Sequence, residues 1–202
     1  MKCDKKNMLL YAVTDRAWVG KQTLCEQVEA ALKGGCTCVQ LREKELSDAE
    51  FLEEAVKIHE ICKHYGVPFI VNDNVDIAVK CHAEGIHVGQ DDMKASCVSA
   101  HTVEEAVEAV KNGADYLGAG AVFGSSTKQN AGAMKKETLR SICEAVDIPV
   151  VAIGGINGKN LKELSHTGID GVALVSAIFA ADDIENTCRA LRNLTEETVK
   201  SK

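Results

Sequence analysis

The chain contains few prolines and few aromatic residues, and it lacks a long hydrophobic run. Two prolines and 46 % hydrophobic residues among 202 exclude a disordered low-complexity segment. The longest apolar stretch, near "GVALVSAIFAA", is far shorter than the ~18 residues that a membrane-spanning helix needs. At the start, "MLLYAV" is too brief for a signal peptide and continues directly into "TDR". We therefore expect a cytoplasmic protein without a membrane partner.

Excess positive charge and metal-binding cysteine spacings are also absent. The formal net charge of −7 argues against nucleic acid as the main partner, although local charge can still bind anionic ligands. The nine cysteines include the close pair Cys36 and Cys38, which lacks the spacing of a redox or zinc pair and has no second cluster to partner it. Cys62 and Cys81 lie in apolar patterns, where reduced cysteine packs as a small hydrophobe. We predict no disulfide framework and no structural metal site.

Strand-like and helix-like segments alternate along the whole chain. The strand-like runs are almost continuously aliphatic, as in a parallel sheet buried on both faces. Eight units of about 20–30 residues favour a closed barrel, and no glycine-rich dinucleotide motif follows the first strand. The prediction is one α/β domain over residues 1–202, a (β/α)8 TIM barrel. Its strands are expected at 8–15, 38–44, 68–73, 85–90, 95–101, 116–123, 149–155 and 171–179. Its helices are expected at 21–34, 47–65, 75–83, 102–112, 136–146, 157–167 and from Asp182, with Ser47 and Thr102 as N-caps and Gly66 and Gly113 as stops.

The functional site of such a barrel lies at the carboxyl ends of its strands. In this chain those ends are polar and charged almost without exception, and two acidic ends are flanked by ends that carry Arg, Lys or glycine. They are residues 14–16, 40–44, 72–73, 89–92, 99–101, 123–130, 154–155 and Ser176.

The loops after the last two strands have the features of a phosphate site. Gly154 and Gly155 end the seventh predicted strand, and Val175 and Ser176 lie in the eighth. In barrels these loops commonly bind phosphate through backbone N–H groups, and glycine lets the anion approach the backbone closely. A tight turn that requires glycine is the alternative.

Basic and acidic residues at the other strand ends suit a diphosphate and a divalent cation. Arg42 and Lys44 are two positions apart on a strand, so they face one side, and Lys128 lies in "SSTKQN". Asp73 and Asp92 are oxygen ligands of the kind that Mg²⁺ takes together with waters and substrate phosphates. Simpler alternatives exist: the two cations extend into solvent, Asp73 caps the next helix, and Asp92 begins a turn.

Eight stretches of the sequence resemble those of one protein family. They occur in the same order as in that family, and they cover nearly the whole chain. They are "YAVTDR", "VQLREKE", "PFIVNDNVDIA", "GIHVGQDD", "VSAHTVEEA", "GADYLGAGAVFGSSTK", "IPVVAIGGI" and "GIDGVALVSAIF". The chain resembles the thiamine-phosphate synthase (thiamine-phosphate pyrophosphorylase) family. The resemblance implies a Mg²⁺-dependent transferase of thiamine biosynthesis. Such an enzyme joins 4-amino-5-hydroxymethyl-2-methylpyrimidine diphosphate to 4-methyl-5-(2-hydroxyethyl)thiazole phosphate and releases pyrophosphate.

The resemblance also implies roles for individual residues, each carried over by position. Contacts to the pyrimidine diphosphate would come from Gln40, Leu41, Arg42, Glu43, Lys44, Asn72, Ser99 and Lys128, of which Arg42, Lys44, Ser99 and Lys128 would be catalytic. The thiazole phosphate would be held by Ser125, Ser126, Thr127, Gly155, Val175 and Ser176, and Mg²⁺ by Asp73 and Asp92.

The chain departs from the family pattern between the fourth and fifth strands. Only "MKASC" separates "GQDD" from "VSAH", and five residues span at most ~18 Å. A parallel crossover normally needs ~10–12 residues. We therefore expect the fourth helix to be missing or shortened, unless the chain as given omits a segment, and Asp92 and Ser99 flank this place. Asn130 also stands where the family commonly has Asp.

Two other functions fit the same fold. Thiazole tautomerase relatives bind thiazole phosphate without coupling it to the pyrimidine. A non-catalytic binder of phosphate ligands would catalyse neither the coupling nor the tautomerisation. The joint presence of "REK", "ND" and "GQDD" favours the coupling enzyme over the tautomerase. His87 alternates with apolar residues, as a hydrogen-bonded core histidine does, but the sequence does not assign roles to His87 and His101. A homo-oligomer is compatible with the sequence and is not specified by it.

Overall fold

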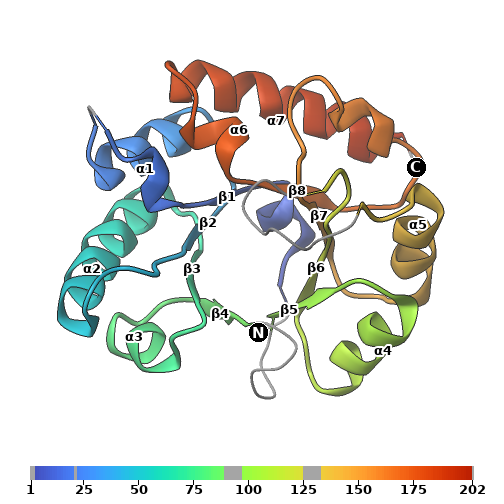
Figure 1. The fold of residues 1–202 in the computed structure, drawn as a ribbon, viewed down its shortest axis with the longest axis horizontal. Coiled ribbons are helices and arrows are strands. Elements are labelled where there is room, and N and C mark those ends of the chain that lie inside the picture. Colours follow the sequence, from blue (N-terminus) through green and yellow to red (C-terminus); the bar gives the residue numbers. More distant parts are fainter. Residues whose placement is uncertain (1–2, 21, 89–96, 125–132, 202) are drawn as a thin grey trace.

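The fold is an eight-stranded parallel barrel surrounded by helices (Figure 1). The computed structural model describes residues 3–20, 22–88, 97–124 and 133–201. The strands are β1 (Leu10–Val13), β2 (Cys38–Leu41), β3 (Phe69–Asn72), β4 (Gly85–His87), β5 (Cys97–Ala100), β6 (Tyr116–Gly120), β7 (Val150–Ile153) and β8 (Gly171–Leu174). The helices are α1 (Leu24–Lys33), α2 (Asp48–Tyr65), α3 (Val75–Lys80), α4 (Val103–Lys111), α5 (Lys136–Ala145), α6 (Ser176–Phe179) and α7 (Ile184–Lys200). Three short 3-10 helices are η1 (Lys5–Met8), η2 (Arg16–Trp18) and η3 (Leu161–Leu164).

The strands follow the order β4-β3-β2-β1-β8-β7-β6-β5, and each pairs with its neighbour in parallel. β4 and β5, the two ends of this order, lie next to each other in Figure 1. Among the described residues no backbone ladder joins them, but His87 Nε2 on β4 lies 3.4 Å from Ser99 Oγ on β5. The predicted TIM barrel is therefore confirmed, and β4 and β5 meet at the place where the sequence is short.

The junction of β4 and β5 coincides with the predicted loss of a helix. Every other pair of consecutive strands has a helical segment between its members. In the described part of the chain none lies between β4 and β5, which are separated only by residues 88–96. Of those, residues 89–96 lie outside the described residues.

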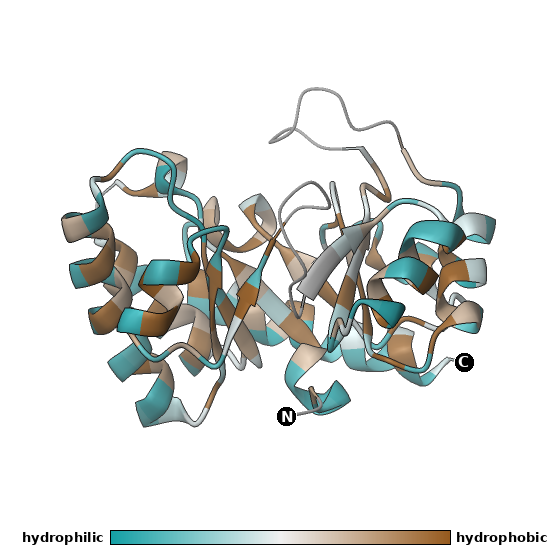
Figure 2. Cartoon of the chain, turned by 90° about the horizontal axis from the view of Figure 1, so that it is seen from below, coloured by the Kyte–Doolittle hydropathy of each residue, from teal (hydrophilic) through white to brown (hydrophobic). Residues whose placement is uncertain are grey.

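Side chains alternate between two hydrophobic clusters along each strand. Tyr11 and Val13 of β1 face the barrel interior, where they pack with residues of β2, β3, β6, β7 and β8 and with Met8 of η1. Leu10 and Ala12 face outward and pack with the helices. Figure 2 shows hydrophobic residues concentrated in the strands, with η1 lying below the barrel at the N-terminal end of the strands. Because η1 covers that end, we expect ligands to enter the barrel at the carboxyl ends of its strands.

The predicted helix signals are found at most helix ends. Thr23 and Ser47 form capping boxes with Glu26 and Glu50, and Thr102 caps α4. Gly66 ends α2 in the left-handed conformation, with φ of +65°. Each of these groups satisfies backbone atoms that the first or last helical turn leaves unpaired.

Two predicted elements differ from the structure. The strand predicted over 171–179 is split into β8 and the short helix α6, and the helix predicted over 157–167 is reduced to the 3-10 turn η3. An uninterrupted apolar run fits a buried strand and a buried helix equally well, so periodicity could not locate this break.

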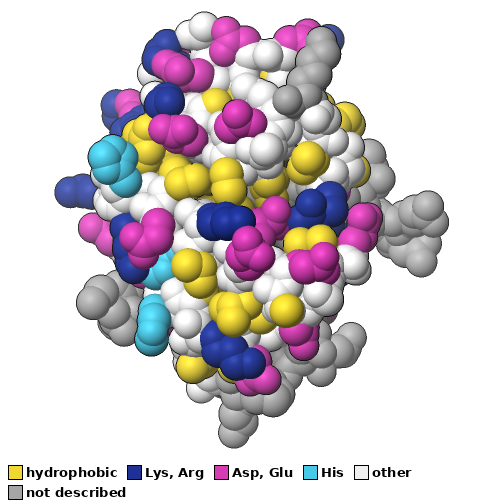
Figure 3. All heavy atoms as spheres, turned by 90° about the vertical axis from the view of Figure 1, so that its left-hand side faces the viewer, with side chains coloured by type: hydrophobic (Ala, Val, Ile, Leu, Met, Phe, Trp, Pro, Cys, Tyr) yellow, Lys and Arg dark blue, Asp and Glu magenta, His cyan; other side chains and the backbone are white. Residues whose placement is uncertain are grey.

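The face of the molecule over α1, α2 and α3 carries interspersed acidic and basic side chains with hydrophobic groups among them (Figure 3). Val56, Val75 and Val79 are exposed hydrophobics of α2 and α3. No helix in the described residues combines the length and the apolar character that crossing a membrane requires.

Candidate active site

A cavity of about 350 Å³ opens at the carboxyl ends of the strands, and all eight strands contribute to its wall. The predicted site residues that line it are Gln40, Arg42, Lys44, Asn72, Asp73, Ser99, Gly155, Val175 and Ser176. Leu41 and Glu43, also expected to contact substrate, do not line it. Five further predicted residues lie outside the described residues: Asp92, Ser125, Ser126, Thr127 and Lys128.

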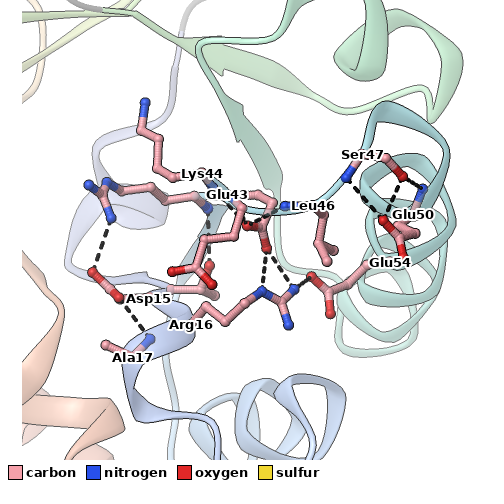
Figure 4. Close-up of polar contacts among 12 residues, drawn as sticks. Asp15, Arg16, Ala17, Glu43, Lys44, Leu46, Ser47, Glu50 and Glu54 are labelled. Atoms are coloured by element: carbon pink, nitrogen blue, oxygen red, sulfur yellow. Dashed lines mark hydrogen bonds and ion pairs between the residues drawn. The ribbon is translucent and has the colours of Figure 1, made fainter.

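Leu41 and Glu43 follow the alternation of β2. Leu41 is fully buried in the outer cluster between strands and helices. Glu43 turns toward Arg16, whose guanidinium lies between the carboxylates of Glu43 and Glu54, with contacts of 2.6 Å to each (Figure 4). Both side chains therefore support the wall of the cavity from behind.

Glu43 organises the segment that carries the two basic groups. One carboxylate oxygen accepts hydrogen bonds from the backbone N–H groups of Lys44, Glu45 and Leu46, at 2.7, 2.7 and 3.2 Å. Burial of Glu43 raises its pKa, but the bonds from Arg16 and from the three N–H groups outweigh this, so the pKa lies below its ordinary value. An ionised carboxylate thus holds the turn after β2 in one conformation.

We expect Glu43→Gln to destabilise the fold by about 2 kcal/mol at neutral pH, because hydrogen bonds to a charged group are lost. A carboxyl with a lowered folded-state pKa stabilises the protein above its unfolded pKa, and this contribution disappears as pH falls through the folded value. The difference in unfolding free energy from wild type should therefore shrink below about pH 4. Urea unfolding across pH measures it, with the exposed Glu144→Gln as a control expected to change stability by less than about 0.5 kcal/mol. A difference that is constant down to pH 2 would contradict this assignment.

Arg42 and Lys44 both line the cavity, and each faces its own carboxylate. Arg42 Nη1 lies 3.0 Å from Asp15 Oδ2, and Lys44 Nζ lies 2.5 Å from Asp73 Oδ2. β2 ends at Leu41, so both cations stand just beyond the strand and not on it as predicted. The expected repulsion between them is reduced by these acidic partners. The side chain of Arg42 is 26 % exposed and that of Lys44 is 52 % exposed, so only Lys44 reaches well into solvent.

Asp73 is available for a ligand because its neighbour performs the capping. The side chain of Asn74 accepts a hydrogen bond from the backbone N–H of Ile77 at 3.0 Å and caps α3. Asp73 itself has a φ of +63°, and its N–H donates to the carbonyl of His87 on β4 at 2.8 Å. The sequence-based alternative that Asp73 caps the helix is therefore wrong.

The carboxylate of Asp73 suits a hard cation such as Mg²⁺. Asp73 offers a half-exposed carboxylate at the mouth of the cavity. Mg²⁺ commonly binds one or two carboxylates and completes its shell with waters and substrate phosphates, so this donor fits the ion. Within the described residues no three His, Cys, Asp or Glu side chains gather around a point, and Asp92, the other predicted ligand, lies outside those residues.

The opposite wall of the cavity contains the predicted phosphate loop. Gly154 and Gly155 have φ of +100° and +65°, and the amides of Asn157 and Asn160 bond to the carbonyl of Gly155 at 3.3 and 2.9 Å. β7 and β8 are neighbours, so this turn lies beside Ser176, the first residue of α6. A Cβ on Gly155 would approach the carbonyl oxygens of Phe123 and Gly124 to 2.9 Å.

Gly155→Ala should destabilise the protein more than Gly66→Ala, which is a matched control. Both glycines have a φ of +65°, so each alanine incurs about 1–2 kcal/mol of left-handed strain. Only Gly155 has backbone atoms that the new methyl group would strike, whereas nothing lies within 4 Å at Gly66. We expect an additional 1 kcal/mol or so at Gly155, together with weaker thiazole phosphate binding. If thermal unfolding shows equal losses of stability in the two variants, and Gly155→Ala leaves the affinity for thiazole phosphate unchanged, the turn at Gly155 is not a phosphate-binding loop.

Sequence reasoning did not identify two tyrosines that line the cavity. Tyr11 and Tyr116 are buried in the barrel interior beneath the cavity, and their hydroxyls lie 2.8 Å apart. His87 is a hydrogen-bonded strand histidine, as its pattern indicates, and it faces Tyr116; His101 is exposed at the mouth and contacts Glu105. An aromatic residue at an inward position of an aliphatic strand is the signal that could have found both tyrosines.

Similarity to known proteins agrees with this geometry. The sequence profile of the thiamine monophosphate synthase family matches residues 10–178. A thiamine-phosphate synthase of Clostridium acetobutylicum is 44 % identical over 200 residues, covering 93 % of this chain and 95 % of the relative. Another, from Ruminiclostridium cellulolyticum, is 47 % identical over 199 residues, with the same coverage of both chains.

Solved structures show the same likeness. The thiamine phosphate pyrophosphorylase of Pyrococcus furiosus superposes with a TM-score of 0.89 at 38 % identity, covering 96 % of this chain and 98 % of its own. A (S)-3-O-geranylgeranylglyceryl phosphate synthase of Thermoplasma acidophilum shares the fold alone, with a TM-score of 0.68 at 14 % identity and coverage of 96 % and 95 %. From its sequence profile and its close relatives, the chain belongs to the thiamine monophosphate synthase family.

Proposed function

We propose that this chain is a thiamine-phosphate synthase. It joins 4-amino-5-hydroxymethyl-2-methylpyrimidine diphosphate to 4-methyl-5-(2-hydroxyethyl)thiazole phosphate, giving thiamine phosphate and pyrophosphate. The observation that carries the proposal is one cavity with two anion-binding walls. Arg42 and Lys44 stand on one side, and the turn at Gly155 and the first residue of α6, Ser176, stand on the other.

The chemistry requires departure of a charged leaving group and no nucleophilic side chain. The C–O bond to the diphosphate breaks first and leaves a pyrimidine methylene cation, which the 4-amino group of the ring can delocalise. The thiazole nitrogen then captures this carbon. Arg42 and Lys44, with Lys128 by family resemblance, bind the departing diphosphate and neutralise its growing charge. Gln40, Asn72 and Ser99, which share the cavity wall, bind and orient the pyrimidine.

The proposal includes a magnesium ion at the diphosphate. Asp73, with Asp92 by family resemblance, would hold it, and it would act as a Lewis acid on the leaving group. Asp73 already bonds to Lys44, so the same side chain can hold the lysine near the diphosphate. The predicted cytoplasmic location and a homo-oligomeric state stay predictions from the sequence.

One assay separates this function from its alternatives. The protein is incubated with both substrates and Mg²⁺, and thiamine phosphate and pyrophosphate are quantified together. Equal amounts of both products are expected. Thiazole phosphate binding without product would instead identify a binder, and isomerisation of the thiazole without coupling would identify a tautomerase.

A further inference from the structure

A row of hydrogen bonds crosses the barrel interior beneath the cavity. Gln40 Nε2 on β2 donates to the hydroxyl of Tyr11 on β1 at 2.8 Å, and that hydroxyl lies 2.8 Å from the hydroxyl of Tyr116 on β6. Tyr116 is 3.2 Å from His87 Nδ1 on β4, and His87 Nε2 is 3.4 Å from Ser99 Oγ on β5. β1 and β6 are separated by β8 and β7 in the sheet, so the contact between the tyrosines spans the interior.

Packing alone does not explain these hydroxyls. Tyr11 and Tyr116 are each 1 % exposed and Gln40 is 4 % exposed, amid aliphatic residues of the inner cluster. Phenylalanine would fill nearly the same volume without a polar group that must be paired. The two rings also meet edge to face, with centroids 5.8 Å apart, and that contact needs no hydroxyl. The oxygens therefore have a role beyond filling the barrel.

The row has a direction because a tyrosine hydroxyl has one proton to donate. With the amide nitrogen of Gln40 donating to Tyr11, the proton of Tyr11 is available for Tyr116. Tyr116 can then donate to Nδ1 of His87 if that nitrogen is unprotonated, and the proton on Nε2 points to Ser99. With a proton on Nδ1, His87 would donate to Tyr116 instead. Tyr116 would then be able to donate to Tyr11, and Tyr11 to the amide oxygen of Gln40.

The direction decides what Gln40 offers to a ligand. In the observed orientation its nitrogen is engaged with Tyr11, and its oxygen is available to the cavity that the residue lines. In the reversed orientation the oxygen would be engaged, and only N–H donors would face the ligand. The amide itself is nearly symmetric in shape, so without the row either orientation fits.

We propose that Tyr11, Tyr116 and His87 are positioning residues that hold the Gln40 amide with its oxygen toward the substrate. This inference rests on the proposed function. The cavity then selects a pyrimidine whose exocyclic group is an amine, a hydrogen-bond donor, over one whose exocyclic group is a carbonyl. The amine becomes a stronger donor as the leaving group departs, since the ring cation delocalises onto it, so the same orientation also favours ionisation.

Binding selectivity tests the proposal with a tyrosine-to-phenylalanine series. Dissociation constants are measured, with Mg²⁺ and without thiazole phosphate, for the aminopyrimidine diphosphate and its oxo analogue. We expect wild type to favour the amine by at least about 100-fold, because a site built around one hydrogen bond rejects the mismatched group strongly. Tyr11→Phe and Tyr116→Phe should lower this ratio by about tenfold or more. Tyr65→Phe, whose hydroxyl contacts Glu29 on the helical surface, is the matched control and should keep the wild-type ratio.

A spectroscopic measurement tests the row independently of any substrate. Nitrogen-15 NMR of the histidine rings, assigned with a His87→Gln variant, should show His87 protonated at Nε2 and bare at Nδ1. A proton on Nδ1 would overturn the proposal, as would folded Tyr11→Phe and Tyr116→Phe proteins that keep the wild-type selectivity. If wild type binds neither pyrimidine and forms no product, the proposed function fails and the selectivity argument fails with it.

Discussion

Removal of divalent metal should abolish formation of thiamine phosphate by this protein. The departing pyrophosphate is the most highly charged species in the reaction, and the two described cations at the cavity mouth are already partly neutralised by Asp15 and Asp73. Two unit charges 4 Å apart at an effective dielectric of 20 interact by ~4 kcal/mol. Loss of even half of one such contact in the transition state lowers the rate by about 30-fold, and a divalent ion makes several.

The measurement compares turnover in excess chelator with turnover after Mg²⁺ is restored. Asp73→Asn should raise the Mg²⁺ concentration for half-maximal activity by at least about tenfold, because one anionic ligand is lost. The control is Asp147→Asn, because Asp147 is an exposed carboxylate outside the cavity wall. This substitution should leave the Mg²⁺ concentration for half-maximal activity unchanged. Full activity in chelator would remove Asp73 and Asp92 from the mechanism.

Arg42→Ala should lower turnover by at least about tenfold, and Lys128→Ala should do the same. Arg42 lines the cavity and is oriented by Asp15 Oδ2 at 3.0 Å, so its guanidinium is held ready for an anion. Arg42→Lys should recover part of the loss, because it keeps the charge but not the planar fork that pairs with Asp15 and with phosphate oxygens together.

The control for this series is Arg140→Ala. Arg140 is an exposed arginine of α5 paired with Glu144, and its removal should leave turnover within about twofold of wild type. Steady-state kinetics on proteins with unchanged thermal unfolding check the series. Near-normal kinetics in both the Arg42→Ala and Lys128→Ala proteins would refute the assignment of these cations to the leaving group.

The order of elements and most of the site wall were predictable because the signals are local. Continuous aliphatic runs identify strands buried on both faces, and cap residues such as Ser47 and Gly66 mark where a helix begins and ends. In a parallel barrel the carboxyl ends of all strands meet at one rim, so strand positions alone bring Gln40, Asn72 and Ser99 together.

The local signals did not predict the partner of Glu43 in the turn after β2. Alternation places Arg42 and Lys44 on one side and Glu43 on the other, yet a position-by-position likeness to a family assigned all three to the substrate. The structure turns Glu43 toward Arg16 and Glu54, which are 27 and 11 residues away along the chain. Which cation pairs with that carboxylate depends on how η2 and α2 pack against β2.

The sequence by itself determined the barrel, its rim and the chemical character of the rim, because these follow from hydrophobic periodicity and from residue types at strand ends. Only the tertiary structure decided which side chains face each other across the interior. The contact of Tyr11 with Tyr116 joins strands that are not neighbours, and the pairing of Lys44 with Asp73 joins two separate loops. A period of two residues tells which way a side chain points, but its partner is fixed only when the sheet curls into a ring.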